Sequence, residues 1–366
     1  MKFLEDKYKY YLEHNLIRKL SPFNYNNEII DFTSSDYLNI ASSKNLKKSI
    51  LTGFEKYGFG SKSSSIVCGY NSSVKAFEDK FANFVDYPKA IFFSSGFMAN
   101  LAIYSTLFND KNTLFADKFI HTSIIDGIKL SKAKFKRYKH QDFSHLVKIY
   151  DNNSFVTTEG MFSTTGTITN LSQITSIVPN KLIVDEAHSF GVLGKNGQGS
   201  VHNHNLTPAN CPIVVFPLGK AFGGVGAVVC TTPQLADYLH QFARSYIYTT
   251  ALPPLILEAS ITQLDNLIAA NDQREKLNNN IRYFNKLCDE KALLLASKDL
   301  SPIRSIIIKN NNLVMNLKQK LEQENIAVSC FRYPTVPKNL TMLRFSIHAN
   351  NSFAEINKAI DIIINF

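Results

Sequence analysis

Residues 213–224 read IVVFPLGKAFGG, an apolar run that ends in a glycine-rich turn. The β-branched start predicts a buried strand, because such side chains suit a covered, pleated surface. Lys220 then stands at the end of a core strand, with little side-chain bulk around it. Burying an ammonium group is costly, so a lysine in this place is a candidate Schiff-base nucleophile. Taken alone, the stretch favours an ordinary surface lysine in a strand-to-loop turn, and only the rest of the chain reverses this interpretation.

Further short apolar runs flank this one in the middle of the chain. They cover residues 90–93, 113–116, 154–157, 181–184 and 226–230. Polar or helix-period segments separate them. This alternation is typical of a mostly parallel sheet that is covered by helices on both faces.

The N-terminal and C-terminal parts of the chain have a different pattern of apolar residues. Residues 3–19 have the spacing of an amphipathic helix, and residues 257–285 predict one long helix, since they contain no Pro or Gly. Strand and helix patterns then alternate, which favours a separate α+β domain. We expect an N-terminal helix and short strand over residues 1–45, a large α/β domain over 46–256, and a linking helix with a small α+β domain over 257–366.

Composition narrows the class of protein. The chain has 366 residues, of which 45% are hydrophobic and 19% charged, as in a soluble globular protein of two domains. No apolar run approaches the roughly 20 residues of a membrane span, and the first residues lack a signal peptide's apolar core, so we expect a cytoplasmic protein. Five separated cysteines without a Cys-x-x-Cys pair argue against a disulfide framework or a zinc site.

The net charge of +10 is explained mainly by a solvated surface. It also suits an acidic partner, such as a phosphorylated cofactor or a carrier of acyl groups. Binding of nucleic acid would need a recognisable motif as well as charge, and the sequence contains none.

We look for functional residues in the segments that follow the apolar runs, because ligands of open α/β sheets bind beyond the carboxyl ends of the strands. Residues 94–97 (SSGF) open a helix after the first run, and free N–H groups at such a turn suit a phosphate. His121 follows the next run and can stack on a flat ring or be structural. Ser163 lies in a hydroxyl cluster after the third run, where local backbone capping is the ordinary role.

Asp185 directly follows the run at residues 181–184. A half-buried carboxylate needs a cationic partner, and a protonated pyridine nitrogen would be one. His188 lies three residues further on and can reach the same pocket. A metal site of Asp185, Glu186 and His188 is also open, although successive strand residues point to opposite sides.

Four features therefore fall at one edge of the predicted sheet: a phosphate turn, a ring-stacking histidine, an acid for a pyridinium and a Schiff-base lysine. Each is weak alone. Together they describe a site for pyridoxal phosphate.

The sequence resembles the α-oxoamine synthases, a branch of the fold-type I pyridoxal-phosphate enzymes. The resemblance runs from about residue 29 to the C-terminus. Its motifs are residues 57–61 (YGFGS), 95–100 (SGFMAN), 121–123 (HTS), 158–163 (TEGMFS), 185–188 (DEAH), 218–223 (LGKAFG), 248–254 (YTTALPP), 332–337 (RYPTVP) and 343–347 (LRFSI). It implies an α/β fold-type I architecture, with a large domain built on a mostly parallel seven-stranded sheet and a smaller α+β C-terminal domain.

The resemblance also implies roles for the site residues. Lys220 would hold pyridoxal 5'-phosphate covalently, Asp185 would pair with its ring nitrogen, and His121 would stack on the ring. Ser163 and His188 would hydrogen-bond the phenolic oxygen. Phosphate contacts would come from the turn at Ser95, Gly96 and Phe97 and, across a homodimer interface with shared active sites, from Thr250.

Three arginines stand where the resemblance implies contacts with the substrates. The match to the family's motifs is good for Arg344 and weaker for Arg332 and Arg18. Arg344 would bind the carboxylate of the amino acid, Arg332 would line the same entrance, and Arg18 would meet the far carboxylate of the acyl substrate. For each of them, a solvated surface charge is the plain alternative.

The implied reaction is the decarboxylating condensation of an amino acid with an acyl thioester. The segment at residues 332–337 favours L-alanine and a pimeloyl thioester, on CoA or a carrier protein, as in biotin synthesis. The alternatives are another member of the branch, which uses glycine or serine with a different acyl-CoA, and a non-catalytic protein with the same fold. Three departures motivate the last: Pro217 where a phosphate-binding threonine is expected, Ser35 for an asparagine, and Ile66 for a histidine or arginine.

Overall fold

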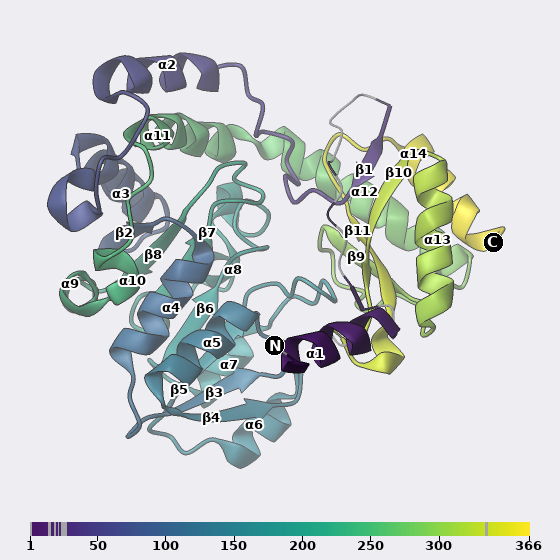
Figure 1. Cartoon of the computed structure of the whole chain (residues 1–366), viewed down its shortest axis with the longest axis horizontal. Helices are drawn as coiled ribbons and strands as arrows, with labels where there is room; N and C mark the ends of the chain where they lie inside the picture. The colour runs from purple at the N-terminus through teal and green to yellow at the C-terminus, as the bar shows by residue number, and fades with distance from the viewer. Residues whose placement is uncertain (1, 14–15, 18–19, 21, 23–27, 334–335) are drawn as a thin grey trace.

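The computed structural model describes residues 2–13, 16–17, 20, 22, 28–333 and 336–366. Figure 1 shows two sheets, each covered by helices, that lie side by side. The larger sheet has seven strands in the order β2-β8-β7-β6-β5-β3-β4, and the smaller has four in the order β1-β10-β11-β9.

Six strands of the large sheet run parallel, and only β8 is antiparallel to its neighbours. In sheet order the strands are β2 (Lys89–Phe93), β8 (Ala227–Thr231), β7 (Ile213–Pro217), β6 (Leu182–Asp185), β5 (Phe155–Glu159), β3 (Thr113–Asp117) and β4 (Lys134–Tyr138). The predicted fold class is confirmed. All six apolar runs form strands.

The edge strand β4 carries no apolar run in the sequence. Its residues KFKRY are exposed or half-buried except for Tyr138. Exposed basic side chains are a common way to keep a sheet edge from pairing with another chain. They also remove the hydrophobic signal by which a strand is recognised.

Alternate residues of each central strand feed two separate cores. On β7, Ile213 and Val215 pack toward α4 (Gly96–Leu107), α5 (Thr122–Ser131) and α9 (Pro233–Phe242). Val214 and Phe216 face the opposite core. That core is covered by α3 (Ser72–Phe84), α6 (Phe143–Ile149), α7 (Leu171–Ile177) and α11 (Pro254–Ala269).

The small sheet joins the two ends of the chain. The strand β1 (Ile30–Phe32) pairs in parallel with β10 (Ile326–Phe331), and β10 continues through β11 (Met342–Ser346) to β9 (Ile303–Ile307). In Figure 1 the purple β1 lies beside the yellow-green strands of the C-terminal part. The helices around this sheet are α12 (Asn271–Glu290), α13 (Asn311–Gln323) and α14 (Phe353–Ile364). The domain limits predicted from the sequence remain predictions.

The long helix expected over residues 257–285 is two helices. It breaks at Ala270, between α11 and α12, where the backbone has φ −79° and ψ 38°. The buried Arg274 donates to the carbonyl oxygens of Leu267 (2.9 Å) and Ile268 (3.1 Å) at the end of α11, and the carbonyl of Leu267 also accepts from the N–H of Ala270 (3.2 Å). A side-chain cap of this kind leaves no Pro or Gly signal in the sequence.

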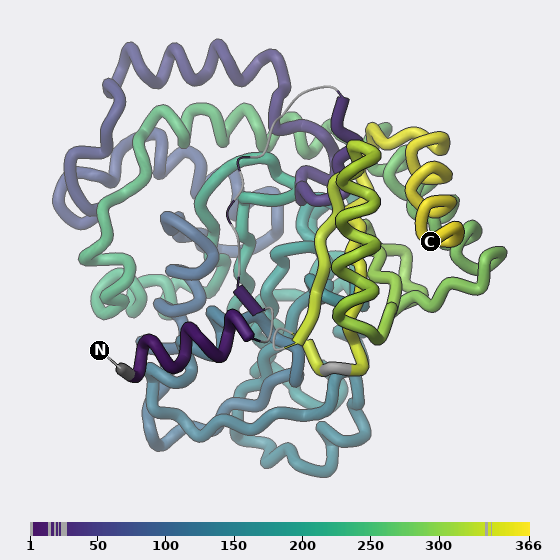
Figure 2. The backbone as a smooth tube through the Cα atoms, turned by 45° about the vertical axis from the view of Figure 1, so that its right-hand side comes forward, coloured from purple at the N-terminus to yellow at the C-terminus, as the bar shows by residue number. Residues whose placement is uncertain are grey.

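The remaining helices lie at the periphery or in connections. They are α1 (Lys2–Glu13), α2 (Leu46–Tyr57), the π-helical turn η1 (Ser65–Gly69), η2 (Lys195–Gly197), α8 (Ser200–Asn203), α10 (Arg244–Ile247) and η3 (Lys338–Leu340). Figure 2 shows α1 on the outside of the molecule, and of the helix predicted over residues 3–19 the positions 14–15 and 18–19 lie outside the described residues. Among the described residues, no helix is long and apolar enough to cross a membrane.

Glu78 of α3 is a buried carboxyl that ties the edge of the large sheet to the η1 turn. It accepts hydrogen bonds from the N–H of Phe92 on β2 (2.8 Å) and from the hydroxyl of Tyr70 (2.9 Å). Burial raises the pKa of Glu78 to about 7, although both hydrogen bonds oppose that rise. The folded chain therefore holds a proton here that an unfolded glutamate has lost by pH 5.

Because the pKa of Glu78 is raised in the folded chain, the free energy of unfolding should decrease as the pH rises. Between pH 4.5 and 7 the native state binds more protons than the unfolded state, so the stability contributed by Glu78 is complete below pH 4.5 and is lost as pH rises through about 7. We expect the free energy of unfolding of the wild type, relative to Glu78→Gln, to fall by up to about 3 kcal/mol from pH 4.5 to pH 8. Urea unfolding at a series of pH values measures this, and parallel pH curves for the two proteins would contradict it.

Candidate functional site

The carboxyl ends of the central strands bring the predicted site residues to one edge of the large sheet. Asp185 is the last residue of β6, and it lies in register with Glu159 on β5. Lys220 lies in the turn after β7, and His121 stands between β3 and α5. The charges of Asp185 and Lys220 both act on the pKa of His121, so the three groups share one environment.

Lys220 is half-buried, and among the described residues its amine has no hydrogen bond or ion pair. Burial lowers the pKa of Lys220, whereas the neighbouring Asp185 and Glu159 act to raise it. A desolvated amine with a depressed pKa is a good nucleophile and base, because a larger share of it is unprotonated.

The turn that presents Lys220 depends on its glycines. The N–H of Gly223 donates to the carbonyl oxygen of Lys220 at 2.7 Å. Gly223 has φ +67°, and a Cβ there would lie 2.8 Å from the Cα of Ala41. The buried Gln263 of α11 closes the same contact by donating to the carbonyl oxygens of Phe222 (2.7 Å) and Ile40 (3.0 Å). The lysine is thus held from both the sheet and the N-terminal segment.

Asp185 is a buried carboxylate, 4% exposed. One oxygen accepts from the N–H of Ala187 (2.9 Å) and the other from the side-chain amide of Asn100 on α4 (2.8 Å). Both donors are neutral, and Asp185 forms no ion pair among the described residues. It is therefore an anion that still lacks a cationic partner.

Glu186 does not join Asp185. Its carboxylate faces the other side of the sheet, where it accepts from the N–H of Ser200 (2.8 Å), the hydroxyl of Ser200 (2.8 Å), the N–H of Val201 (2.7 Å) and the hydroxyl of Ser189. Gly160 and Gly199 border this carboxylate so closely that a Cβ at either would overlap it. Glu186 thus anchors the turn that carries Asp185 and His188, and a metal site of the three residues has no support from this arrangement.

His188 is buried, and its Nδ1 lies 2.7 Å from the hydroxyl of Tyr37. Burial holds the pKa of His188 well below its ordinary value, and burial also raises the pKa of Tyr37. The tyrosine therefore keeps its proton and donates it to Nδ1, which leaves the imidazole proton on Nε2. Ser35, one of the three departures, interacts with the same tyrosine hydroxyl.

The turn after β2 has the features of an anion site. Ser95 caps α4, and its hydroxyl accepts from the N–H of Met98 (3.2 Å). The N–H groups of Gly96 and Phe97 have no partner among the described residues, as expected for the first turn of a helix. Gly96 packs against Pro217, whose Cγ would lie 2.8 Å from a Cβ at that position. Pro217 therefore supplies packing in the place where a hydroxyl was expected.

Arg344 of β11 connects the small sheet to this edge of the large one. Its Nη1 donates to the carbonyl oxygen of Ser163 (3.0 Å), and its guanidinium stacks over Phe331 at 5.0 Å. The Nε is buried without a partner among the described residues. Burial lowers the pKa of Arg344, and its charge acts on both His188 and Lys220. Arg344 is thus part of the cluster rather than a solvated surface charge.

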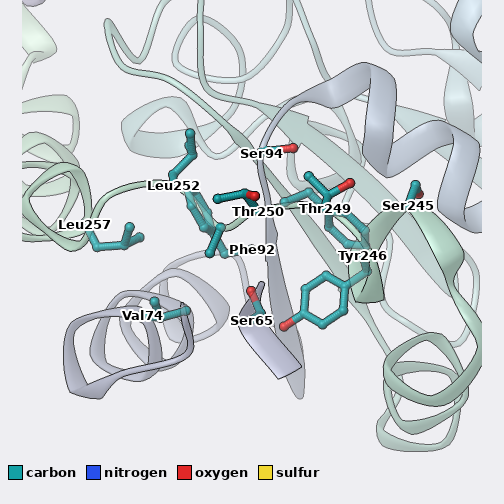
Figure 3. Close-up of a pocket in the computed structure, with 12 residues that line it drawn as sticks. Ser65, Val74, Phe92, Ser94, Ser245, Tyr246, Thr249, Thr250, Leu252 and Leu257 are labelled. Carbon is teal, nitrogen blue, oxygen red and sulfur yellow. The ribbon is translucent and has the colours of Figure 1, made fainter. Parts of the chain in front are cut away.

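No contact with this cluster is seen for the other predicted substrate and cofactor residues that the structure describes. Arg332 is half-buried after β10, and among the described residues its side chain makes no hydrogen bond, while its carbonyl oxygen accepts from the N–H of Val336 (3.3 Å). Arg18 lies outside the described residues. Thr250 is exposed and forms an isolated bridge with Ser64. It borders a cavity of about 20 Å³ beside Ser94, which Figure 3 shows between η1, α10 and the end of β2.

Sequence reasoning missed several members of the site. Asn100, Ser123 and Glu159 lie within the quoted motifs, and Tyr37 lies two residues after the departure at Ser35, but no role was assigned to their side chains. Their positions became meaningful only when β3, β5, β6 and α4 were brought together.

The residues present fit pyridoxal phosphate. Within the part of the chain that the structure describes, an amine without a partner, a buried carboxylate without an ion pair, free helix N–H groups and a buried guanidinium nitrogen without a partner lie at one strand edge. The first three groups match parts of that cofactor, namely the aldehyde carbon, the ring nitrogen and the phosphate, and the guanidinium matches the carboxylate of an amino-acid substrate.

Comparison with known proteins agrees with this chemistry. A family model described as aminotransferase class I and II matches residues 27–363. The chain belongs to this family. It is 34% identical over 341 residues to an 8-amino-7-oxononanoate synthase of Saccharophagus degradans, covering 91% of this chain and 86% of that protein.

Solved structures of the family place the chain within its α-oxoamine synthase branch, as the sequence motifs predicted. A crystal structure of 8-amino-7-oxononanoate synthase from Francisella tularensis has 60% sequence identity and a TM-score of 0.87, covering 93% of this chain and 98% of that one. A serine palmitoyltransferase of Sphingomonas wittichii has a TM-score of 0.89 at 23% identity, covering 100% of this chain and 96% of that one, and shows the shared fold alone.

The contact between Tyr37 and His188 yields a testable prediction. Tyr37→Phe removes the donor to Nδ1 and leaves a buried acceptor unpaired, so we expect a loss of about 1–3 kcal/mol in the free energy of unfolding. The proton of His188 is then no longer confined to Nε2, so we also expect weaker binding of pyridoxal phosphate, measured by fluorescence titration of the apoprotein.

Tyr87→Phe is the matched control. Its hydroxyl is also buried and donates to the carbonyl oxygen of Cys211 (2.7 Å), far from the strand ends that hold the site. It should lose comparable stability and keep the wild-type affinity for the cofactor. Equal affinities of the two variants would show that Tyr37 acts only on stability.

Proposed function

We propose that the protein catalyses the decarboxylating condensation of L-alanine with a pimeloyl thioester, giving 8-amino-7-oxononanoate for biotin synthesis. The observation that carries this proposal is the 60% identity to the Francisella tularensis enzyme of that name over 93% of the chain. The grouping of Lys220, Asp185, His121 and His188 at one strand edge supports it.

Pyridoxal 5'-phosphate is the proposed cofactor, and when bound it acts as an electron sink for a carbanion at the α-carbon of the amino acid. Lys220 would hold it covalently, with Asp185 at the ring nitrogen and His121 against the ring face. The turn at residues 95–97 would bind its phosphate. Ser163 and the Nε2–H of His188 would contact the phenolic oxygen.

The residues of the chain then perform binding and proton transfer. Among the described residues the buried Nε of the half-buried Arg344 has no partner, so it can hold the carboxylate of alanine at a point where little water competes. The amine of Lys220 has a depressed pKa, so it can accept the α-proton near neutral pH. The half-buried setting limits the access of water to that proton.

A homodimer with shared active sites is proposed as the functional form. Large apolar side chains are exposed in the two segments that the bridge between Ser64 and Thr250 joins: Phe59 is 79% exposed, Val67 74% and Tyr248 73%. Side chains of this size are commonly covered by a partner. Such an interface would bring Thr250, which faces outward in one subunit, toward the phosphate turn of the other. A cytoplasmic location stays a prediction.

The alternative within the branch is glycine or serine with a different acyl-CoA. The motifs and the fold are common to the branch, so the substrate pair decides between the alternatives. We expect turnover with L-alanine and pimeloyl-CoA at a rate well above that with glycine and acetyl-CoA. Measuring release of free CoA together with carbon dioxide tests both pairs in one assay.

Lys220→Ala is the control for chemistry at this site. It should abolish both turnover and the visible absorbance of lysine-bound cofactor, while the thermal unfolding midpoint stays near the wild-type value. Turnover with glycine and none with alanine would overturn the proposed substrates. Cofactor binding with no turnover of either pair would favour a non-catalytic role.

A further inference from the structure

A chain of hydrogen bonds connects the acid of the site to its ring-stacking histidine. The side-chain amide of Asn100 lies 2.8 Å from a carboxylate oxygen of Asp185 and 3.0 Å from the hydroxyl of Ser123. That hydroxyl lies 2.8 Å from Nδ1 of His121. Asn100 and Ser123 are 2% and 1% exposed, so little water competes for the contacts between Asp185, Asn100 and Ser123, whereas His121 itself is exposed and its contact with Ser123 is part-buried.

The carboxylate of Asp185 decides which way the amide of Asn100 points. With the NH₂ group toward Asp185, a donor meets an acceptor at 2.8 Å. With the amide reversed, two oxygens would meet at that distance beside an anion, which is repulsive. The chosen orientation leaves Oδ1 of Asn100 buried without a partner among the described residues. The charge of Asp185 therefore outweighs the cost of one unpaired carbonyl oxygen.

This orientation fixes every proton along the chain. Both hydrogens of the Asn100 amide are used, one by Asp185 and one by Ser123. Ser123 accepts from Asn100, so its own proton is free to go to Nδ1 of His121. The backbone N–H of Ser123 also donates to Nδ1, at 3.3 Å. Nδ1 thus receives donors and holds no proton, and the imidazole proton of His121 is on Nε2.

We propose that Asn100 and Ser123 are positioning residues that fix His121 as the neutral Nε2–H tautomer and tie this state to the ionised carboxylate of Asp185. The inference rests on the proposed function only in taking His121 and Asp185 as cofactor contacts. It assigns a further task to the motif at residues 95–100, beyond its N-terminal phosphate turn.

The reason for such coupling is electrostatic. A protonated His121 would add a second cation next to the pyridinium that Asp185 stabilises, and the two would compete for one carboxylate. Burial lowers the pKa of His121, and the charge of Lys220 lowers it further, whereas Asp185 acts in the opposite direction. The donors from Ser123 oppose protonation at Nδ1 directly, because that nitrogen has no free lone pair.

Selective ¹⁵N labelling of histidine tests the tautomer without reference to the reaction. His121→Gln identifies the pair of ring signals that belongs to His121, in the apoprotein and with pyridoxal phosphate bound. We expect the wild type to show a protonated Nε2 and an unprotonated Nδ1 near neutral pH. Ser123→Ala should reduce the Nε2–H to Nδ1–H ratio by about fivefold, the equivalent of one hydrogen bond of about 1 kcal/mol. Ser123→Thr, which keeps the hydroxyl, should restore it.

Asn100→Ala tests the link to the acid. It should lower the tautomer ratio as Ser123→Ala does and, in addition, shift the pH midpoint of the visible absorbance of bound cofactor, since Asp185 loses a donor. Tyr104→Phe is the matched control, because Tyr104 lies one turn further along α4. Its buried hydroxyl contacts Thr157 and takes no part in the hydrogen bonds between Asp185 and His121.

The inference is overturned if Ser123→Ala keeps the wild-type tautomer ratio, or if Tyr104→Phe shifts the ratio as much as Asn100→Ala does. These results are independent of the proposed substrates. Loss of the tautomer effect with normal turnover of alanine would refute the positioning role alone, whereas the expected tautomer effect without turnover would refute the proposed reaction alone.

Discussion

The buried carboxylate of Asp185, which forms no ion pair among the described residues, is the charge on which the arrangement of the site depends. It sits at the end of β6, held by two neutral donors, where its charge is poorly screened by water. It orients Asn100 and acts on the pKa values of Lys220 and His121, and it adds to the rise that burial causes in the pKa of the adjacent Glu159. A site organised around an anion without a partner is prepared for a cationic ring.

The position of the site between two sheets explains why distant parts of the chain are joined. Arg344 reaches Ser163 from the small sheet, and Tyr37 reaches His188 from the segment after β1. His348 in turn lies 3.0 Å from the carbonyl oxygen of Ser34. The pairing of β1 with β10 therefore also holds the N-terminal segment in the position from which the hydroxyl of Tyr37 donates to Nδ1 of His188.

Much of this architecture could be predicted, because strong local patterns produce it. Each buried strand of the large sheet is a short apolar run, and the residues after those runs form the site. The exposed edge strand β4 had no such run. The break at Ala270 depends on Arg274 of α12, whose partners include Leu267 on the preceding helix α11 and Gly191, which is distant in the sequence. The link from Asn100 to His121 depends on register and tautomer, which one-dimensional patterns do not contain.

The central claim is that the charge of Asp185 makes the site work. The most direct measurement is the rate at which L-alanine exchanges its α-hydrogen for deuterium in heavy water, with the cofactor bound and no acyl donor, in wild type and Asp185→Asn. This substitution keeps the shape and removes the charge. The account predicts a fall of about a hundredfold or more, the scale of losing one well-placed electrostatic contact. Exchange at the wild-type rate by the folded, cofactor-loaded variant would contradict it.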